Sequence, residues 1–115
     1  MTAGFERGDV VWHPAPYKDD PDAGRPFVIL SDEYHPYHGE EYIVVALTTV
    51  SRPQALPLAD TDWTRGGTLR DSYVSPWYVM SLKGANFDAG VGQLRDTTVD
   101  RIASEIGAYV GADSR

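Results

Sequence analysis

The sequence predicts a mainly β fold, a small and largely antiparallel β-barrel of five to seven short strands with one C-terminal α-helix. Two observations predict it. Short runs rich in β-branched and aromatic residues recur over most of the 115 residues, separated by clusters of Pro, Gly and Asp. Apolar residues at helical spacing occur in one stretch, near the C-terminal end. Because no linker or second block of pattern interrupts the chain, we expect a single domain over residues 1–115.

The first three strands are predicted over residues 9–13, 26–31 and 41–49. The first run ends at Pro14, and the polar, Asp-rich stretch 17–24 that follows indicates an exposed loop. The second run is apolar throughout, which is typical of a strand covered on both faces. A hairpin-like connection over residues 32–40 leads to the third run, whose β-branched content makes it the clearest strand of the sequence.

The second half alternates short strands with glycine-rich connections. Residues 55–58 indicate an edge strand, because the proline within them has no N–H to donate to a ladder. Residues 60–67 indicate a long loop, and residues 72–82 indicate one or two strands bent at Pro76. The glycine-punctuated stretch 86–94 leads into the helix.

The helix is predicted to start at Asp96 or Thr97, either of which can cap its N-terminus, and to end at Gly111. Five apolar residues recur at helical spacing on one face: Val99, Ile102, Ile106, Tyr109 and Val110. We expect this face to plug the barrel.

The composition excludes several kinds of site and location. The chain has no cysteine, which excludes disulfides, Cys-ligated zinc, iron–sulfur clusters and a thiol nucleophile. The longest apolar run, residues 43–47, is far shorter than the ~20 residues that a membrane span needs. Residues 1–9 lack the apolar stretch of a signal peptide. We therefore expect a soluble, cytoplasmic protein with no membrane partner.

The charge balance bears on the partner. Seventeen acidic against ten basic side chains give a net charge of −7, which at first argues against nucleic acid. Net charge describes the whole surface, however, and Arg25, Arg65 and Arg70 could make one groove locally positive. Twelve acids are Asp and only two cations are Lys. This balance fits either a halophilic host, where salt shortens screening to about 3 Å, or an ordinary acidic protein.

Common catalytic motifs are missing from the sequence. His35 and His38 lie near acidic residues, but their spacing falls in a turn that contains Pro36, which favours a solvated hairpin tip over a metal site. There is no Gly-x-Ser-x-Gly elbow. Gly66-Gly67 is not followed by the Lys-Ser/Thr pair of a phosphate loop. We expect neither a metal nor a cofactor.

Five short motifs occur in a characteristic order. They are Gly8-Asp9-Val10-Val11-Trp12, Gly24-Arg25-Pro26-Phe27-Val28-Ile29-Leu30-Ser31, Val44-Val45-Ala46-Leu47-Thr48-Thr49, Arg70-Asp71-Ser72 and Gly92-Gln93-Leu94. In this order, from about Arg7 to Gly111, the chain resembles the MazF/PemK family of toxin endoribonucleases of type II toxin–antitoxin systems. The resemblance implies an SH3-like barrel that forms a homodimer. It also implies metal-independent, sequence-selective cleavage of single-stranded RNA, often messenger RNA, and neutralisation by a cognate antitoxin.

Two positions match the catalytic pair of that family: Arg25 its arginine and Thr48 its threonine. RNA supplies a 2′-OH that can attack the adjacent phosphate and leave a cyclic phosphate. A guanidinium can hold two phosphoryl oxygens while charge develops on them, and a threonine hydroxyl can donate to another. Without the resemblance, Arg25 would be interpreted as an ion-pair partner of Asp19 or Asp22, and Thr48 as a β-forming residue that ends a strand.

The general base stays open. Because an arginine remains protonated at pH 7, we assign Arg25 mainly to phosphate stabilisation. His13, at the end of the first strand, is a candidate base, since an imidazole exchanges a proton near neutral pH. The alternative is a partly buried histidine that fills the mouth of the barrel beside Pro14.

Four further residues are expected to bind RNA: Thr49, Arg65, Arg70 and Trp77. Trp77 either stacks on a base, worth ~1–3 kcal/mol, or belongs to the core. Arg65 either adds a cation to the groove or decorates an exposed loop. The chain departs from the family pattern over residues 14–23, which puts the recognised RNA sequence in doubt, and at Pro76-Trp77, where relatives often have an acidic residue.

Two other functions are compatible with the same barrel. Some relatives inhibit DNA gyrase by contact rather than catalysis, and a diverged barrel can lose activity and serve as an interaction module. The retained Arg25 and Thr48 favour the nuclease.

Overall fold

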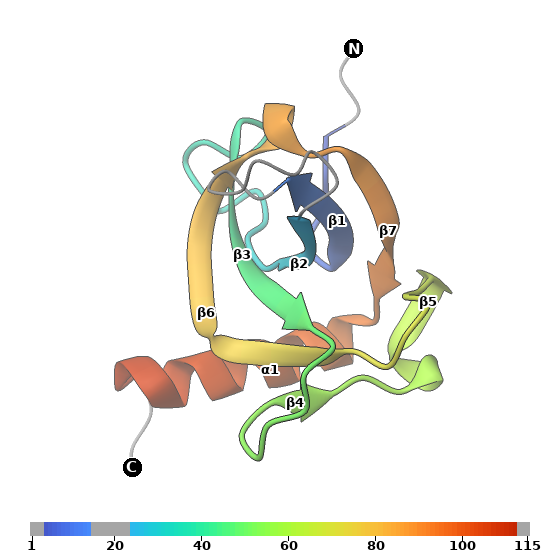
Figure 1. Ribbon diagram of the computed structural model, residues 1–115. Coiled ribbons are helices and arrows are strands. Elements are labelled where there is room, and N and C mark those ends of the chain that lie inside the picture. Colours follow the sequence, from blue (N-terminus) through green and yellow to red (C-terminus); the bar gives the residue numbers. More distant parts are fainter. Residues whose placement is uncertain (1–3, 15–23, 113–115) are drawn as a thin grey trace.

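Seven strands and one long helix form the part of the chain that the computed structural model describes, residues 4–14 and 24–112 (Figure 1). The elements are β1 (Asp9–Pro14), β2 (Gly24–Ile29), β3 (Glu41–Thr48), β4 (Leu56–Pro57), β5 (Trp63–Gly66), β6 (Tyr73–Lys83), β7 (Ala89–Leu94) and α1 (Asp96–Val110). Short 3-10 turns at Asp60–Asp62 and Gly84–Asn86 join some of them. The predicted mainly β class with a C-terminal helix is confirmed.

All strands belong to one antiparallel sheet in the order β4-β6-β3-β2-β1-β7-β5. The sheet is strongly curled, so that in Figure 1 its strands surround a common centre. β6 bends along its length: its first residues pair with β4 and the end of β3, and its last residues pair with the start of β3. The β3–β6 register shifts between Val45 and Leu47, and such an irregularity increases the local bend.

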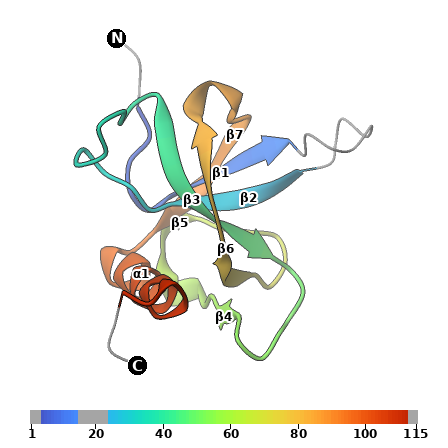
Figure 2. The ribbon, with the colours of Figure 1, turned by 90° about the vertical axis from the view of Figure 1, so that its left-hand side faces the viewer.

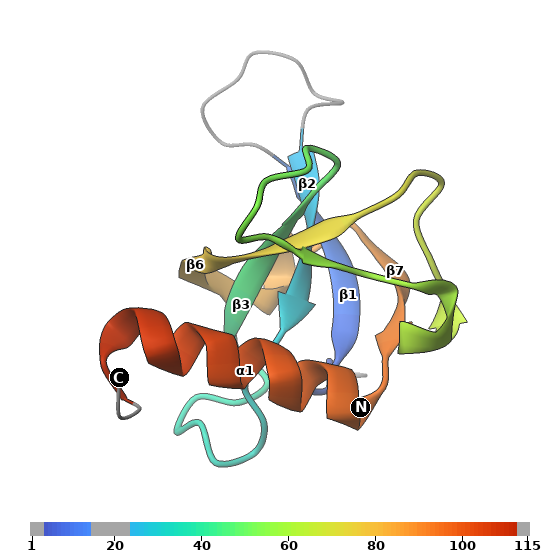
Figure 3. The same ribbon diagram turned by 90° about the horizontal axis from the view of Figure 1, so that it is seen from below.

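Each face of the sheet carries its own core because successive strand residues point to opposite faces. The helix-side cluster consists of Val10, Val28, Val45, Leu47, Val74 and Leu94 with Val99 and Ile102 of α1. The aromatic cluster consists of Val11, Phe27, Ile29, Tyr42, Val44 and Ala46, with Phe5, Leu82 and Phe87 packed against it. Figures 2 and 3 show α1 lying across the strands on the helix side. The second half of β2, residues 27–29, is therefore covered on both faces, as its apolar sequence predicts.

Two strand predictions need correction. β2 covers Gly24–Ile29 rather than residues 26–31, because Gly24 and Arg25 continue the pairing with β1. The predicted loop over residues 60–67 is wrong, since it contains a 3-10 turn and β5. β5 approaches β7 closely at Gly66, where a Cβ would overlap the Val91 carbonyl oxygen, so that a side chain would prevent this pairing.

The N-terminal cap of α1 also differs from the prediction. The cap residue is Arg95, not Asp96 or Thr97. The Arg95 backbone N–H donates to the Asp62 carbonyl at 2.9 Å and its Nε donates to the Thr61 carbonyl at 2.6 Å. The start of the helix is thus fixed by the turn that precedes β5, a contact between segments that are distant in sequence.

The other end of α1 is confirmed in part. Gly111 ends the helix with a left-handed φ of 77°, as predicted. Val99 and Ile102 are buried, and Ile106 is partly buried against the helix-side cluster. Tyr109 and Val110, predicted for the same buried face, are exposed because the last turn of α1 projects past β6 (Figure 1).

Two further sequence-based expectations concern the loop after β1 and the presence of a membrane-spanning helix. The predicted loop over residues 17–24 lies outside the described residues, except for Gly24 in β2. Within residues 4–14 and 24–112, no helix combines the length and the apolar character that crossing a membrane requires.

Candidate active site

Three neighbouring strands bring His13, Arg25 and Thr48 into one row. His13 lies opposite Arg25 in the β1–β2 ladder. Phe27 lies opposite Ala46 at the last pair of the β2–β3 ladder. Arg25 and Thr48 each lie two residues beyond this pair, so their side chains project to the same face as Phe27 and Ala46. Residues opposite each other in antiparallel strands project to the same face. All three side chains therefore belong to the face that carries the aromatic cluster, at the end of the sheet where β2 begins and β3 ends.

Arg25 and Thr48 also line a common cavity of about 610 Å³. The lining residues are Trp12, Gly24, Arg25, Pro26, Leu47, Thr48, Thr49, Gly67, Thr68, Leu69, Arg70, Ser72 and Val91. They include two arginines and four hydroxyl side chains, and none of them is acidic. The protein has a net charge of −7, yet every charged residue among the described residues that line this cavity is an arginine.

The Arg25 side chain is exposed and lies over an aromatic ring. Its Cζ is 5.2 Å from the centroid of the Tyr78 ring, a cation–π distance. The ion pairs of the described residues involve three other arginines, Arg7, Arg65 and Arg101. Asp19 and Asp22, the alternative partners predicted for Arg25, lie outside the described residues.

Thr48 is half-buried at the end of β3, and its Oγ1 accepts a hydrogen bond from the Val50 N–H at 3.1 Å. Among the described residues the Thr48 hydroxyl donates to no acceptor, so its hydrogen is available to a ligand oxygen in the cavity. Thr49, also predicted to bind RNA, is exposed and lines the same cavity.

His13 does not line the cavity, although it shares the row with Arg25. Its Nδ1 lies 2.7 Å from the Pro14 carbonyl oxygen. Because a carbonyl only accepts, Nδ1 carries the hydrogen of this bond, and Nε2 of a neutral ring keeps its lone pair. The ring packs edge-on against Phe27 and Phe87, with centroids 6.2 and 6.3 Å away.

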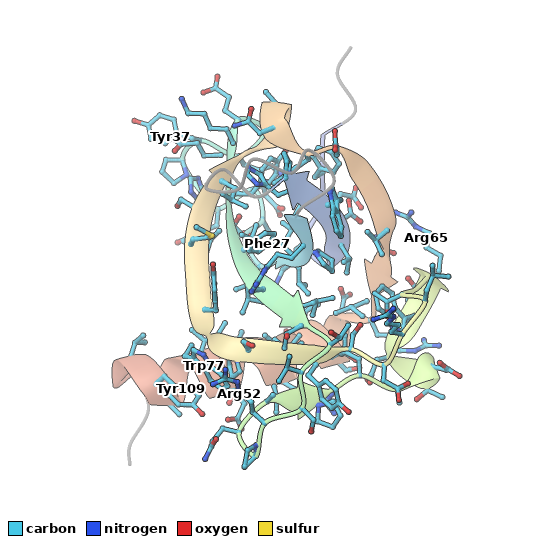
Figure 4. All side chains as sticks on the ribbon, viewed as in Figure 1. Phe27, Tyr37, Arg52, Arg65, Trp77 and Tyr109 are labelled. Atoms are coloured by element: carbon cyan, nitrogen blue, oxygen red, sulfur yellow. The ribbon has the colours of Figure 1, made fainter. Side chains whose placement is uncertain are left out.

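The remaining predicted RNA-binding residues separate into two groups. Arg70 lines the cavity on the loop between β5 and β6, next to the fully exposed Leu69. Arg65 does not line it, and its guanidinium lies 3.4 Å from the Asp9 carboxylate. Trp77 also lies away from the cavity, where its ring packs edge-on against Tyr109 of α1 at a centroid distance of 6.0 Å (Figure 4).

Sequence reasoning missed several residues of the site. Trp12 belongs to the motif Gly8-Asp9-Val10-Val11-Trp12, but neither its residue type nor its spacing predicts that it lines a cavity. Thr68 and Ser72 join the wall through the loop that precedes β6. The sequence around Tyr78 does not indicate its contact with Arg25, because that contact depends on β6 and β2 both flanking β3.

The histidines of residues 32–40 make contacts within the protein. His35 Nδ1 accepts the Tyr37 N–H at 2.9 Å, and the His38 ring packs on Tyr42 at 5.5 Å. Across the described residues, no group of three or more His, Asp or Glu side chains is placed to hold a metal ion.

Comparison with solved structures finds the same fold in several toxins. An endoribonuclease in complex with its cognate antitoxin, from a mycobacterial species, superposes with a TM-score of 0.74 at 18% identity, over 99% of this chain and 100% of that one. The Mycobacterium tuberculosis toxin MazF-mt6 gives 0.67 at 19% identity, over 92% and 99% of the two chains. MazF from Deinococcus radiodurans gives 0.73 at 14% identity, over 96% and 99%. No curated protein matches the chain by sequence.

The sequence family is established independently of these superpositions. The family model of the PemK-like, MazF-like toxins matches residues 6–110, which includes every strand and the whole of α1. The order of motifs, the curled sheet with its C-terminal helix and this match agree. The chain belongs to the PemK-like, MazF-like toxins of type II toxin–antitoxin systems.

Proposed function

We propose that this chain is an endoribonuclease toxin that cleaves single-stranded RNA, messenger RNA included, at selected sequences and without a metal ion. The observation that carries the proposal is the cavity whose charged residues, among the described residues that line it, are Arg25 and Arg70 in a protein that is acidic overall. A local cationic, hydroxyl-lined cavity suits a phosphodiester. The family and the solved endoribonucleases with this fold support the same activity.

The reaction we propose is an internal transesterification. The 2′-OH loses its proton to a base and its oxygen attacks the adjacent phosphorus. The bond from phosphorus to the 5′-oxygen breaks, and the 5′-oxygen takes up a proton from that base or from water, which gives a 2′,3′-cyclic phosphate and a 5′-hydroxyl. The guanidinium of Arg25 holds the phosphoryl oxygens as their negative charge grows, and the free hydrogen of the Thr48 hydroxyl donates to one of them. DNA lacks the 2′-OH, so it binds without being cut.

The proton of the 2′-OH needs an acceptor, and His13 is our candidate. The support for this role is its place opposite Arg25 and the Nδ1–H bond to Pro14, which leaves the lone pair of a neutral ring on Nε2. A His13→Gln variant retains a side chain of similar size that cannot act as a base. If His13 is the base, this change alters the shape of the pH profile of kcat, whereas a packing role for the ring leaves that shape unchanged.

We also propose two protein partners, a cognate antitoxin and a second copy of the chain, acting in the cytoplasm. The second copy is supported by an apolar face made of Ile43, Trp77, Val79 and Tyr109, each 39–45% exposed. Trp77 and Val79 project to one side of β6, and Ile43 of the adjacent β3 pairs with Ser81 on the same side. A partner sheet and helix would remove these side chains from water.

The decisive experiment incubates the purified protein with single-stranded RNA and with DNA of the same sequence, in EDTA, at low and at molar salt. We expect cyclic-phosphate RNA fragments, intact DNA, and loss of cleavage in Arg25→Ala. Arg52→Ala is the matched control, because it removes an exposed arginine that is not among the cavity-lining residues. If the wild-type protein cuts no RNA at either salt concentration, the proposal is wrong, and a supercoiling assay then tests inhibition of gyrase.

A further inference from the structure

We propose that Tyr78 is a positioning residue for Arg25, an inference that rests on the function proposed above. The Cζ atom of Arg25 lies 5.2 Å from the centroid of the Tyr78 ring, within the range of an attractive cation–π contact. Tyr78 belongs to β6 and Arg25 to β2, two strands that are separated by β3. The contact therefore passes over β3, next to the proposed phosphate site.

The sheet register explains how the two strands meet. Val45 pairs with Val79, and Tyr78 lies one residue beyond this pair, where the β3–β6 register shifts. Phe27 of β2 lies opposite Ala46 of β3. Strands two apart are separated by roughly 9.5 Å, and only a small side chain on the middle strand lets groups on the outer strands touch above it. Ala46 supplies this gap, and the Phe27 and Tyr78 rings meet with centroids 6.4 Å apart.

Tyr78 is held on one side by buried structure. Phe27 is 4% exposed and belongs to the aromatic cluster, and the edge-on contact with it limits the rotation of the Tyr78 ring. The other side of Tyr78 is open enough to receive Arg25, since the residue is 42% exposed. A ring anchored on a rigid core can thus give a long, flexible arginine side chain a preferred place.

An aromatic partner suits the chemistry better than an acidic one. A carboxylate beside Arg25 would occupy its N–H groups and neutralise its charge. An aromatic ring instead contacts the guanidinium while the charge and the N–H edge remain available to phosphate. Tyr78 therefore orders Arg25 before substrate arrives, which lowers the entropy cost of forming the reactive arrangement.

The first arm of the test is kinetic. Tyr78→Leu is expected to lower kcat about two- to five-fold with KM unchanged, whereas Tyr78→Phe keeps the ring and retains wild-type kcat. Replacement of Tyr78 with pentafluorophenylalanine keeps the ring size but reverses its quadrupole, so kcat falls as in Tyr78→Leu even if the leucine variant folds poorly. Tyr37→Leu is the matched control, an exposed tyrosine on the loop between β2 and β3. Equal kcat in the leucine and phenylalanine variants would overturn the proposal.

The second arm is independent of RNA cleavage. In a ¹H–¹⁵N spectrum the Arg25 Nε–H, assigned with Arg25→Lys, is expected to show a ring-current shift that survives in Tyr78→Phe and disappears in Tyr78→Leu. An Arg25 signal that is the same in wild-type protein and Tyr78→Leu contradicts the proposal. If the wild-type protein cuts no RNA, the proposed function fails, and this spectrum alone decides whether Tyr78 orders Arg25.

Discussion

Gly24 lies directly against the indole ring of Trp12 at the start of β2. A Cβ added to Gly24 would be 2.8 Å from Cε2 and Nε1 of the ring and 2.6 Å from the carbonyl oxygen of His13. Two of these atoms belong to a ring that lines the cavity, and the third belongs to the backbone of the paired strand. The residue that precedes the proposed catalytic arginine therefore has no room for a side chain.

This contact predicts the effect of Gly24→Ala. The added methyl group must push β2 away from β1 or displace the Trp12 ring, and either movement shifts Arg25. We expect kcat to fall on the order of 100-fold, as for a misplacement of about 1 Å, with a loss of about 1–3 kcal/mol in the free energy of unfolding. Gly90→Ala is the control, because a Cβ there meets no atom within 4 Å. Similar kcat values for the two variants would show that the close packing at Gly24 does not place Arg25.

The hydrogen bonds of Asp62 predict that its replacement lowers the free energy of unfolding without changing catalysis. Its carboxylate accepts the Ala59 N–H and the Thr98 hydroxyl, both at 2.7 Å, and so joins the turn before β5 to the first turn of α1. Asp62→Ala leaves both donors without this partner, and we expect urea denaturation to show a loss of about 2 kcal/mol. Asp100→Ala, which removes an exposed carboxylate paired with Arg7, should cost less than about 0.5 kcal/mol. Equal losses in the two variants would contradict this role of Asp62.

Thr48 predicts a catalytic effect that depends on one hydroxyl. Thr48→Val keeps the shape of the side chain but removes the donor to the phosphoryl oxygen, and we expect kcat to fall about 100-fold. Thr48→Ser keeps the hydroxyl and should retain most of the activity. Single-turnover cleavage of one RNA substrate measures both. If the valine and serine variants cleave at the same rate, the hydroxyl has no part in the reaction.

The fold was predictable where the signal is local. β3 is a continuous β-branched run between breakers, and the observed strand differs from the predicted one by a single residue. β5 was not predictable, because it exists through its pairing with β7, and that pairing needs Gly66 beside Val91. A glycine pair in the sequence indicates a loop, and only the partner strand shows that it permits a close approach.

The position of a candidate site residue could be predicted where that residue belongs to one of the ordered motifs. Arg25 and Thr48 were predicted from the order of the motifs, and the structure sets them on neighbouring strands at one cavity. Arg65 and Trp77 were expected in the same groove from residue type alone, but strand order directs one toward Asp9 and the other toward α1. The contact of Tyr78 with Arg25 was not predictable for the same reason, since contacts across β3 depend on which strands flank it.

The exposed ring of Trp77 predicts the oligomeric state. Trp77→Arg sets a charge in the centre of the apolar face, where burial against a second copy would leave it without a partner. We expect light scattering after gel filtration to give a dimer for the wild-type protein and a monomer for Trp77→Arg, with circular dichroism confirming that both are folded. Tyr34→Arg, at a side chain that is 95% exposed on the β2–β3 loop, should remain a dimer. A wild-type monomer, or a Trp77→Arg dimer of undiminished stability, would show that this face does not bind a second copy.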